Sequence, residues 1–307
     1  MRYGSRRCSG RELHWGRHSG VHRRRRYRRV LLPGDEYSIA GGAPRYQLVT
    51  GQDLVAWQLQ VAAGQRLPCS QEELVQSGHA IEARVYAEDP AVSFVPQTGR
   101  VTRFEVPAAP GLRVDSGVRA GTLITHFYDP LLVKLIVHAE DRPTAVTQLR
   151  NQLKGTVLHG IQTNLEYLSD IASTDAFAAG NLDTGFIDQH LSNWKPRPPT
   201  SVELAAVGAV LARDGYARRS YDNHDTWKRL GPWRIGPAGG TPIRIIIGEH
   251  EHKIDVRGGP GRLEVALGTN TFEVELDHDP DSTGCVEPTV DGTRVRMVLS
   301  IHPTECG

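Results

Sequence analysis

Gly78-His79-Ala80-Ile81-Glu82-Ala83-Arg84-Val85-Tyr86-Ala87-Glu88-Asp89-Pro90 is the stretch of sequence that decides the fold around it. Its core alternates between apolar and polar residues, which is the period-two pattern of a half-buried β-strand. Arg84 falls on the polar side of this strand, between Glu82 and Tyr86. Asp89-Pro90 should end the strand, because proline has no N–H to donate and restricts the residue before it. The pattern therefore predicts a strand that displays an arginine between two polar neighbours.

The sequence on either side of this strand predicts an α+β module. Antiparallel strands with helices packed on one side account for its order of elements. The elements are a helix in 48–64 with Thr50 or Asp53 as N-cap, an alternating strand at 99–106, a largely buried strand at 131–137, and two helices capped by Asp141 and Thr163.

Three motifs in this module resemble the C-terminal domain of the biotin carboxylases, in the order and spacing of that family. They are 81–90 (IEARVYAEDP), 128–135 (YDPLLVKL) and 160–164 (GIQTN). The resemblance implies a biotin carboxylase C-terminal domain over residues 48–192 and a family reaction in which ATP activates bicarbonate to carboxylate biotin. It also implies biotin, ATP and Mg²⁺ as cofactors, and a homodimer.

Arg84 is the candidate catalytic residue that the resemblance supplies. In the family an arginine at this position faces the biotin ureido oxygen, where charge develops as the ring nitrogen is deprotonated. A guanidinium suits that task because it is always charged and presents a planar fork of donors. From the pattern alone, an ion pair with Glu82 or Glu88 on a sheet face is the favoured role, and the motif around Arg84 shifts the interpretation to the functional one.

Other polar residues of the three motifs are better explained by structure than by catalysis. Asp129, which follows Tyr128, and Lys134 could satisfy each other as a buried pair. Glu88-Asp89 is expected to form the turn that ends the strand.

The first 47 residues differ from the rest of the chain in charge. They carry twelve arginines against three carboxylates, whereas the remainder carries 24 basic and 32 acidic side chains. An arginine-rich arm could bind nucleic acid through phosphate neutralisation, although no aromatic platform or helical spacing accompanies it. It could also be a mitochondrial transit peptide, although no amphipathic face is visible.

A shifted reading frame is the third interpretation of residues 1–47. Codons for residues 32–46 can be chosen so that reading one base later gives Phe-Leu-Glu-Met-Asn-Thr-Arg-Leu-Gln-Val-Glu-His-Pro-Val-Thr, which resembles the ATP-grasp core of the biotin carboxylases. The same shift applied to residues 14–30 also permits a string of this core. We therefore expect residues 1–47 to be out of frame and disordered. The residues that stand in place of the core's Glu, Asn, Arg, Gln, Glu and His are Gly34, Glu36, Ser38, Ala40, Gly42 and Ala43.

The last third of the chain predicts a linker and a second domain. Residues 193–200 contain three prolines in four positions, which favours an extended linker. In 201–307, Ser201 can cap a helix, and short alternating strands divided by Gly, Asp and Asn turns follow it. A helix followed by hairpins predicts a small barrel-like sheet around the helix.

This order resembles the domain that joins the biotin carboxylase to its partner subunit in acyl-CoA carboxylase α subunits, with methylcrotonyl-CoA carboxylase as the nearest family. The resemblance implies a carboxyltransferase β subunit and a biotin carrier domain as partners. An unrelated all-β appendage is the alternative. The Met-Lys-Met of a biotin carrier is absent from the sequence, since its methionines are Met1 and Met297.

Composition narrows the class of protein. A length of 307 residues predicts about two domains, and no apolar run approaches the roughly 18–20 residues of a membrane span. Four cysteines without metal-ligand spacing fit a reducing compartment, cytoplasm or mitochondrial matrix. We expect a truncated carboxylase α subunit that is inactive alone. A non-catalytic subunit-interaction module and a nucleic-acid binder are the alternatives.

Overall fold

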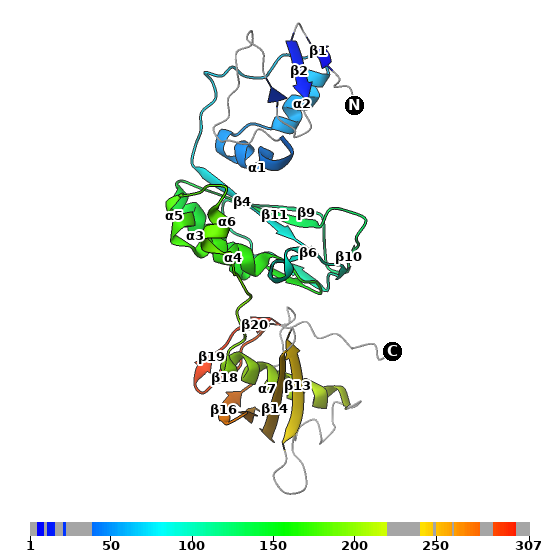
Figure 1. The fold of residues 1–307 in the computed structure, drawn as a ribbon, viewed down its shortest axis with the longest axis vertical. Helices are drawn as coiled ribbons and strands as arrows, with labels where there is room; N and C mark the ends of the chain where they lie inside the picture. Colours follow the sequence, from blue (N-terminus) through cyan, green and yellow to red (C-terminus); the bar gives the residue numbers. More distant parts are fainter. Residues whose placement is uncertain are drawn as a thin grey trace. The chain divides into compact units, whose positions relative to one another are not determined.

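A computed structural model describes residues 5–8, 11–15, 21–22, 39–219, 240–247, 250–259, 261–276 and 285–298 (Figure 1). The chain divides into two compact units, Met1–Pro196 and Arg197–Gly307. The division falls within the predicted linker at 193–200. Each unit has its own apolar core.

The sheet of the first unit has three antiparallel strands. Strand β4 (His79–Tyr86) pairs with β11 (Leu131–Ala139), which pairs on its other side with β9 (Leu112–Ser116). The strand predicted in 78–90 is therefore present and lies at one end of the sheet. Its alternation places Ile81, Ala83 and Val85 in the core, as expected for a half-buried strand.

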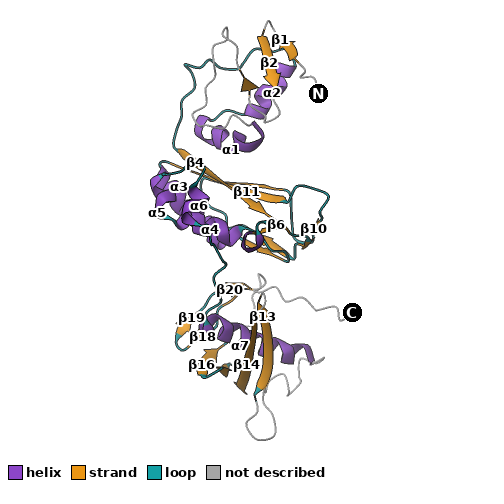
Figure 2. Ribbon diagram, in the orientation of Figure 1, coloured by secondary structure: helices purple, strands orange, loops and turns teal. Residues whose placement is uncertain are grey.

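Four helices lie together at one side of this sheet (Figure 2). They are α3 (Arg142–Gly155), α4 (Leu165–Ser173), α5 (Asp175–Ala179) and α6 (Phe186–His190). Helix α3 packs against β4 and β11 through Val146, Leu149 and Leu153. Asp141 caps α3 as predicted, because its Oδ1 accepts from the N–H of Thr144 at 2.9 Å.

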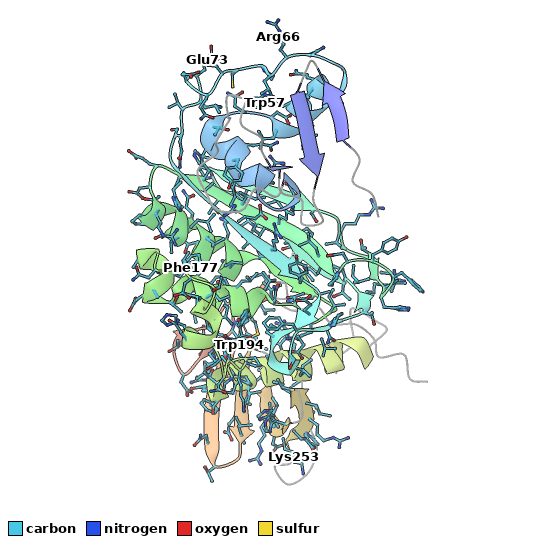
Figure 3. All side chains as sticks on the ribbon, turned by 45° about the horizontal axis from the view of Figure 1, so that its top comes forward. Trp57, Arg66, Glu73, Phe177, Trp194 and Lys253 are labelled. Carbon is cyan, nitrogen blue, oxygen red and sulfur yellow. The ribbon has the colours of Figure 1, made fainter. Side chains whose placement is uncertain are left out.

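Aromatic side chains hold the helices of the first unit together. Figure 3 shows Phe177 among these helices, and the guanidinium of Arg142 lies over its ring at 5.3 Å from the centroid. Trp194 donates from Nε1 to Oδ2 of Asp170 at 2.6 Å and packs edge-on against Tyr167. The start of the predicted linker therefore packs on the first unit.

Short strands complete the first unit. The single strand predicted at 99–106 is wrong, because the chain forms two pieces with different partners. Strand β7 (Gly99–Arg100) pairs with β10 (Leu123–Ile124), and β8 (Arg103–Glu105) pairs with β12 (Val157–His159). The remaining pieces are β5 (Glu88–Asp89), β6 (Val95–Pro96) and the 3-10 turn η1 (Pro90–Val92).

Two helices precede β4. Helix α2 (Leu54–Ala62) confirms the predicted helix, with Asp53 as its N-cap and the buried Trp57 on its inner side (Figure 3). Helix α1 (Ile39–Thr50) was not predicted from the sequence, which placed a disordered segment up to residue 47. It forms because it packs against β4 and β11, where Val49 is buried.

The segment before α1 contains three short strands in the structure. They are β1 (Ser5–Cys8), β2 (Arg11–Trp15) and β3 (Val21–His22). The other residues of 1–38, for which the sequence also predicted disorder, lie outside the described ranges.

The second unit is a helix packed against an antiparallel sheet. Helix α7 (Ser201–Arg219) buries Leu204, Ala205 and Val210 against Ile254 and Val265 of the sheet. The strand order is β13 (Thr241–Ile247), β14 (His250–Gly259), β15 (Arg262–Leu267), β16 (Asn270–Glu275), β18 (Thr289–Val290) and β19 (Thr293–Arg294). Strands β17 (Cys285–Val286) and β20 (Met297–Val298) pair separately.

The predicted barrel is confirmed only as a helix with an antiparallel sheet. Among the described strands, β13 and β19 are the two ends of the sheet, and no pairing closes it. The start of α7 lies one residue earlier than expected, because the hydroxyl of Thr200, and not Ser201, accepts from the N–H of Glu203. In the part of the chain that the structure covers, no helix is long and apolar enough to cross a membrane.

Candidate functional site

The polar face of the three-stranded sheet carries the candidate site. Register places Lys134 of β11 opposite both Arg84 of β4 and Asp115 of β9. Because side chains alternate along a strand, Glu82 and Arg113 belong to the same face, turned away from the core. We call these five residues the polar face.

Arg84 is held by Glu82, two residues before it on the same strand. Its Nε donates to Oε1 of Glu82 at 2.8 Å. The carboxylate is nearly buried, with 4% of its side chain exposed, whereas 39% of the arginine side chain is exposed. The hydrogen bond to Glu82 raises the pKa of Arg84 above its usual range, and burial partly opposes that shift. The guanidinium therefore stays charged and is anchored at its Nε end.

The second carboxylate oxygen of Glu82 is also buried. Among the described residues, Oε2 has no hydrogen-bond partner. A buried acceptor without a donor costs roughly 1–3 kcal/mol.

Arg113 links α1 to the polar face. Its Nε and Nη2 donate to the two oxygens of Asp115 at 2.9 and 3.0 Å, and its Nη1 donates to Oε1 of Gln47 at 2.7 Å. The bond to Asp115 raises the pKa of Arg113. Helix α1 thus covers part of the polar face through a side chain that sequence analysis assigned to a disordered segment.

The weaker sequence candidates have structural roles. Asp89 caps η1 by accepting from the N–H of Ala91 at 2.9 Å, as expected for a strand-ending turn. Asp129 is exposed and accepts from the N–H of Leu131 at 2.8 Å. A buried pair of Asp129 with Lys134 is therefore wrong, because Asp129 is at the surface and Lys134 lies opposite Arg84. Burial, and then the charge of Asp129, raise the pKa of Glu88.

Asn164 contacts the main chain of the candidate residue Arg84, which sequence reasoning did not predict. It was quoted as the last residue of a motif, and Thr163 was predicted to cap the helix after it. In the structure Asn164 precedes α4 and makes no side-chain cap bond. Its buried amide bonds the main chain of Arg84 and Tyr86 instead. The signal in the sequence was that Thr163 could already cap the helix. The side chain of Asn164 was then available for another partner.

The described residues contain no group of three or more His, Cys, Asp or Glu side chains that could hold a metal ion. The residues that stand at the positions of the ATP-grasp string lie outside the described ranges or in the first part of α1, whose side chains are not described. The polar face can present a fixed cation to a small polar group.

Two family models match the chain. Residues 82–189 match the biotin carboxylase C-terminal domain. Residues 199–304 match the BT domain of the methylcrotonyl-CoA carboxylase α subunit. The two matches fall in different units of the structure.

Curated relatives carry the names of the same two families. The mitochondrial methylcrotonoyl-CoA carboxylase subunit alpha of Mus musculus is 41% identical over 76% of this chain, and that of Dictyostelium discoideum is 35% identical over 76%. Biotin carboxylase 2 of Bacillus subtilis is 42% identical over 48%. The chain covers 33–34% of the length of these relatives.

A solved structure supports the same fold for the first unit. It is the biotin carboxylase domain dimer of Hydrogenobacter thermophilus 2-oxoglutarate carboxylase, in complex with MgADP, ADP and bicarbonate. It is 34% identical with a TM-score of 0.51, and the match covers 53% of this chain and 36% of that one.

Proposed function

Since the chain joins a biotin carboxylase C-terminal domain to a BT domain of the methylcrotonyl-CoA carboxylase α-subunit type, we propose that it is part of a biotin-dependent acyl-CoA carboxylase α subunit. The family reaction is ATP- and bicarbonate-dependent carboxylation of biotin. The chain spans about a third of its curated relatives, and the proposal assigns it one wall of the active site.

The placement of Arg84 is the observation that carries this proposal. Glu82 holds the guanidinium from its Nε end at 2.8 Å, and the side chain is partly exposed on the polar face. A cation fixed in this way can stabilise negative charge on the ureido oxygen of biotin without reorganising during the reaction. A charge-assisted hydrogen bond of this kind contributes about 1.5–3 kcal/mol.

The residues present fit biotin better than they fit ATP and Mg²⁺. A guanidinium suits the neutral ureido group and the charge that develops on it. The described residues offer no carboxylate cluster for a divalent cation. We therefore propose that this chain alone does not bind ATP productively and does not carboxylate biotin.

The second unit supports a role in subunit assembly. Strand β13 is an end strand of its sheet, and Ile246 and Ile247 on it are 71% and 41% exposed. Exposed apolar residues beside an unpaired strand edge are typical of interaction surfaces. We propose that this unit joins a carboxyltransferase β subunit. A non-catalytic interaction module is thus the second candidate function.

Further features of the proposal come from the relatives. The Hydrogenobacter thermophilus structure is a dimer, which supports a homodimer for the first unit. A biotin carrier domain remains a proposed partner. The mouse and Dictyostelium relatives are named mitochondrial and the Bacillus subtilis relative is bacterial, so the proposal includes both matrix and cytoplasm.

A chimera tests the proposed function. Residues 48–191 of this chain would replace the matching domain of Bacillus subtilis biotin carboxylase 2, which is 42% identical over 148 residues. With ATP, Mg²⁺, bicarbonate and biotin, we expect the chimera to form carboxybiotin and the chain alone to form none. A folded chimera without turnover would contradict the assignment. Turnover by the chain alone would contradict its proposed incompleteness.

A further inference from the structure

Asn164 is almost fully buried, with 6% of its surface exposed, and its side chain does not serve the helix that it precedes. Buried amide side chains need hydrogen-bond partners, because an unpaired one loses the hydrogen bonds that it makes with water. The partners of Asn164 are not near it in sequence. They are main-chain groups of β4, about 80 residues earlier.

Three hydrogen bonds join Asn164 to the end strand. Its Oδ1 accepts from the N–H of Tyr86 at 2.9 Å, and its Nδ2 donates to the carbonyl of Arg84 at 3.2 Å. The N–H of Asn164 itself donates to the carbonyl of Tyr86 at 3.3 Å. Because β4 pairs, among the described strands, only with β11, Asn164 takes the place of a neighbouring strand at the point where Arg84 lies.

The loop that carries Asn164 is also held by contacts with elements other than β4. It starts at β12, which pairs with β8, and the carbonyl of His159 accepts from the N–H of Thr102 at 2.8 Å. Gly160 has φ +104°, and a Cβ there would run into the carbonyl oxygen of Arg100. At its other end the loop enters α4, which packs on α3. Asn164 therefore connects β4 to a loop that lies between β12 and α4.

We propose that Asn164 is a positioning residue for Arg84. Glu82 fixes the side chain of the arginine, and Asn164 fixes the main chain from which that side chain projects. An end strand without this tie would have free N–H and C=O groups at Tyr86 and Arg84 and would open there first. The inference rests on the proposed function, in which the direction of Arg84 toward biotin matters.

Hydrogen exchange in the full chain tests the structural half of this inference. In Asn164→Ala, we expect the amide of Tyr86 to exchange at least about tenfold faster, while amides of β11 change less than about twofold, because the opening is local. Asn164→Asp keeps the acceptor for Tyr86 but replaces the donor to Arg84 with a carboxylate oxygen, so the Tyr86 amide should stay protected. Asn181→Ala, at an exposed position, is the matched control and should change neither.

Two exchange results would contradict the inference. One is an unchanged Tyr86 amide in Asn164→Ala. The other is equal acceleration throughout β4 and β11, which would show that Asn164 supports the whole unit and does not act locally at Arg84.

A double-mutant cycle in the chimera tests the functional half, because turnover of the parent chimera shows that it folds. We expect Asn164→Ala to lower kcat by roughly 10–100-fold with KM for ATP within about twofold, because small misplacements of a reacting group cost that much. Combined with Arg84→Ala, it should add no further loss, since the two act through one group.

The outcomes separate this inference from the proposed function. If Arg84→Ala alone leaves the chimera active, the role proposed for Arg84 is wrong. If Arg84→Ala abolishes activity while Asn164→Ala keeps it, or if the two losses multiply, the role of Arg84 stands and the inference about Asn164 is wrong.

Discussion

Glu82 with Arg84 on β4 and Asp255 with Arg257 on β14 are the same arrangement in two units, a carboxylate and an arginine two residues apart on one strand. They differ in burial. The Glu82 side chain is 4% exposed, whereas that of Asp255 is 33% exposed. The alternation of a strand therefore does not separate a site from a solvated face.

The two pairs differ also in what holds their strands. Arg257 lies opposite Glu264 of β15, and the pairing of β13 with β14 ends one residue before it, at Val256. Arg84 lies on an end strand whose outer edge is tied by Asn164, from a distant part of the chain.

Core substitutions give the largest effect and should be equal in the two units. Leu135 and Ile254 are 0% and 2% exposed. Leu135→Ala and Ile254→Ala should each lower the free energy of unfolding of their own unit by about 2–5 kcal/mol, from lost burial and the cavity left behind. Urea-dependent hydrogen exchange of β11 and β14 would measure this. A cost below about 1 kcal/mol in one unit would show that the cores of the two units are packed differently. The ion pairs could then not be compared through the stability of their units.

Removing the arginine of each pair should destabilise the two units by different amounts. Arg84→Ala leaves Glu82 as a nearly buried carboxylate without its donor, which should cost roughly 1–3 kcal/mol in unfolding of the first unit. Arg257→Ala leaves a carboxylate in contact with water and should cost less than about 0.5 kcal/mol. The same exchange measurement applies to both variants. Equal costs would mean that Glu82 is no better shielded from water than Asp255.

A pH effect should be the smallest and should lie in the second unit at the start of α7. Arg197, whose Nη2 donates to Oε1 of Glu203 at 2.7 Å, lowers the pKa of Glu203 to about 2. Because the pKa is depressed on folding, the stabilisation is complete above the unfolded pKa near 4.5 and is lost as the pH falls toward 2. The Glu203 side chain is 36% exposed, so screening should keep the effect below about 1 kcal/mol.

Glu203→Gln should flatten this part of the pH profile of unfolding, with Glu264→Gln at an exposed position as its control. Identical profiles for the wild type and Glu203→Gln between pH 5 and 2 would remove Glu203 as the cause.

Local signals explain what could be predicted of the fold. β4 and β11 follow from alternation and apolar runs, and the starts of α2 and α3 follow from Asp53 and Asp141. Elements set by distant contacts could not be found in this way. Residues 99–106 alternate like one strand, but β7 pairs with β10 and β8 pairs with β12. Helix α1 depends on packing against the sheet that follows it in sequence.

The site was predictable in part. Arg84 could be named from its motif and its place on a strand. The burial of Glu82 could not, because a glutamate two residues from an arginine on a strand is normally solvated, as Asp255 is. Asn164 could not be assigned, since asparagine before a helix usually caps it, and its partners lie 78 and 80 residues away.

The turnover of the chimera with and without Arg84 tests the central claim most directly. Arg84→Ala should lower kcat for carboxylation of biotin by roughly 10²–10³-fold, the loss typical of removing one fixed donor to a developing oxyanion. Arg119→Ala, which removes an exposed arginine of the same unit, should leave kcat unchanged. An Arg84→Ala chimera that keeps the kcat of its parent would contradict the assignment of this strand as a wall of a biotin carboxylase site.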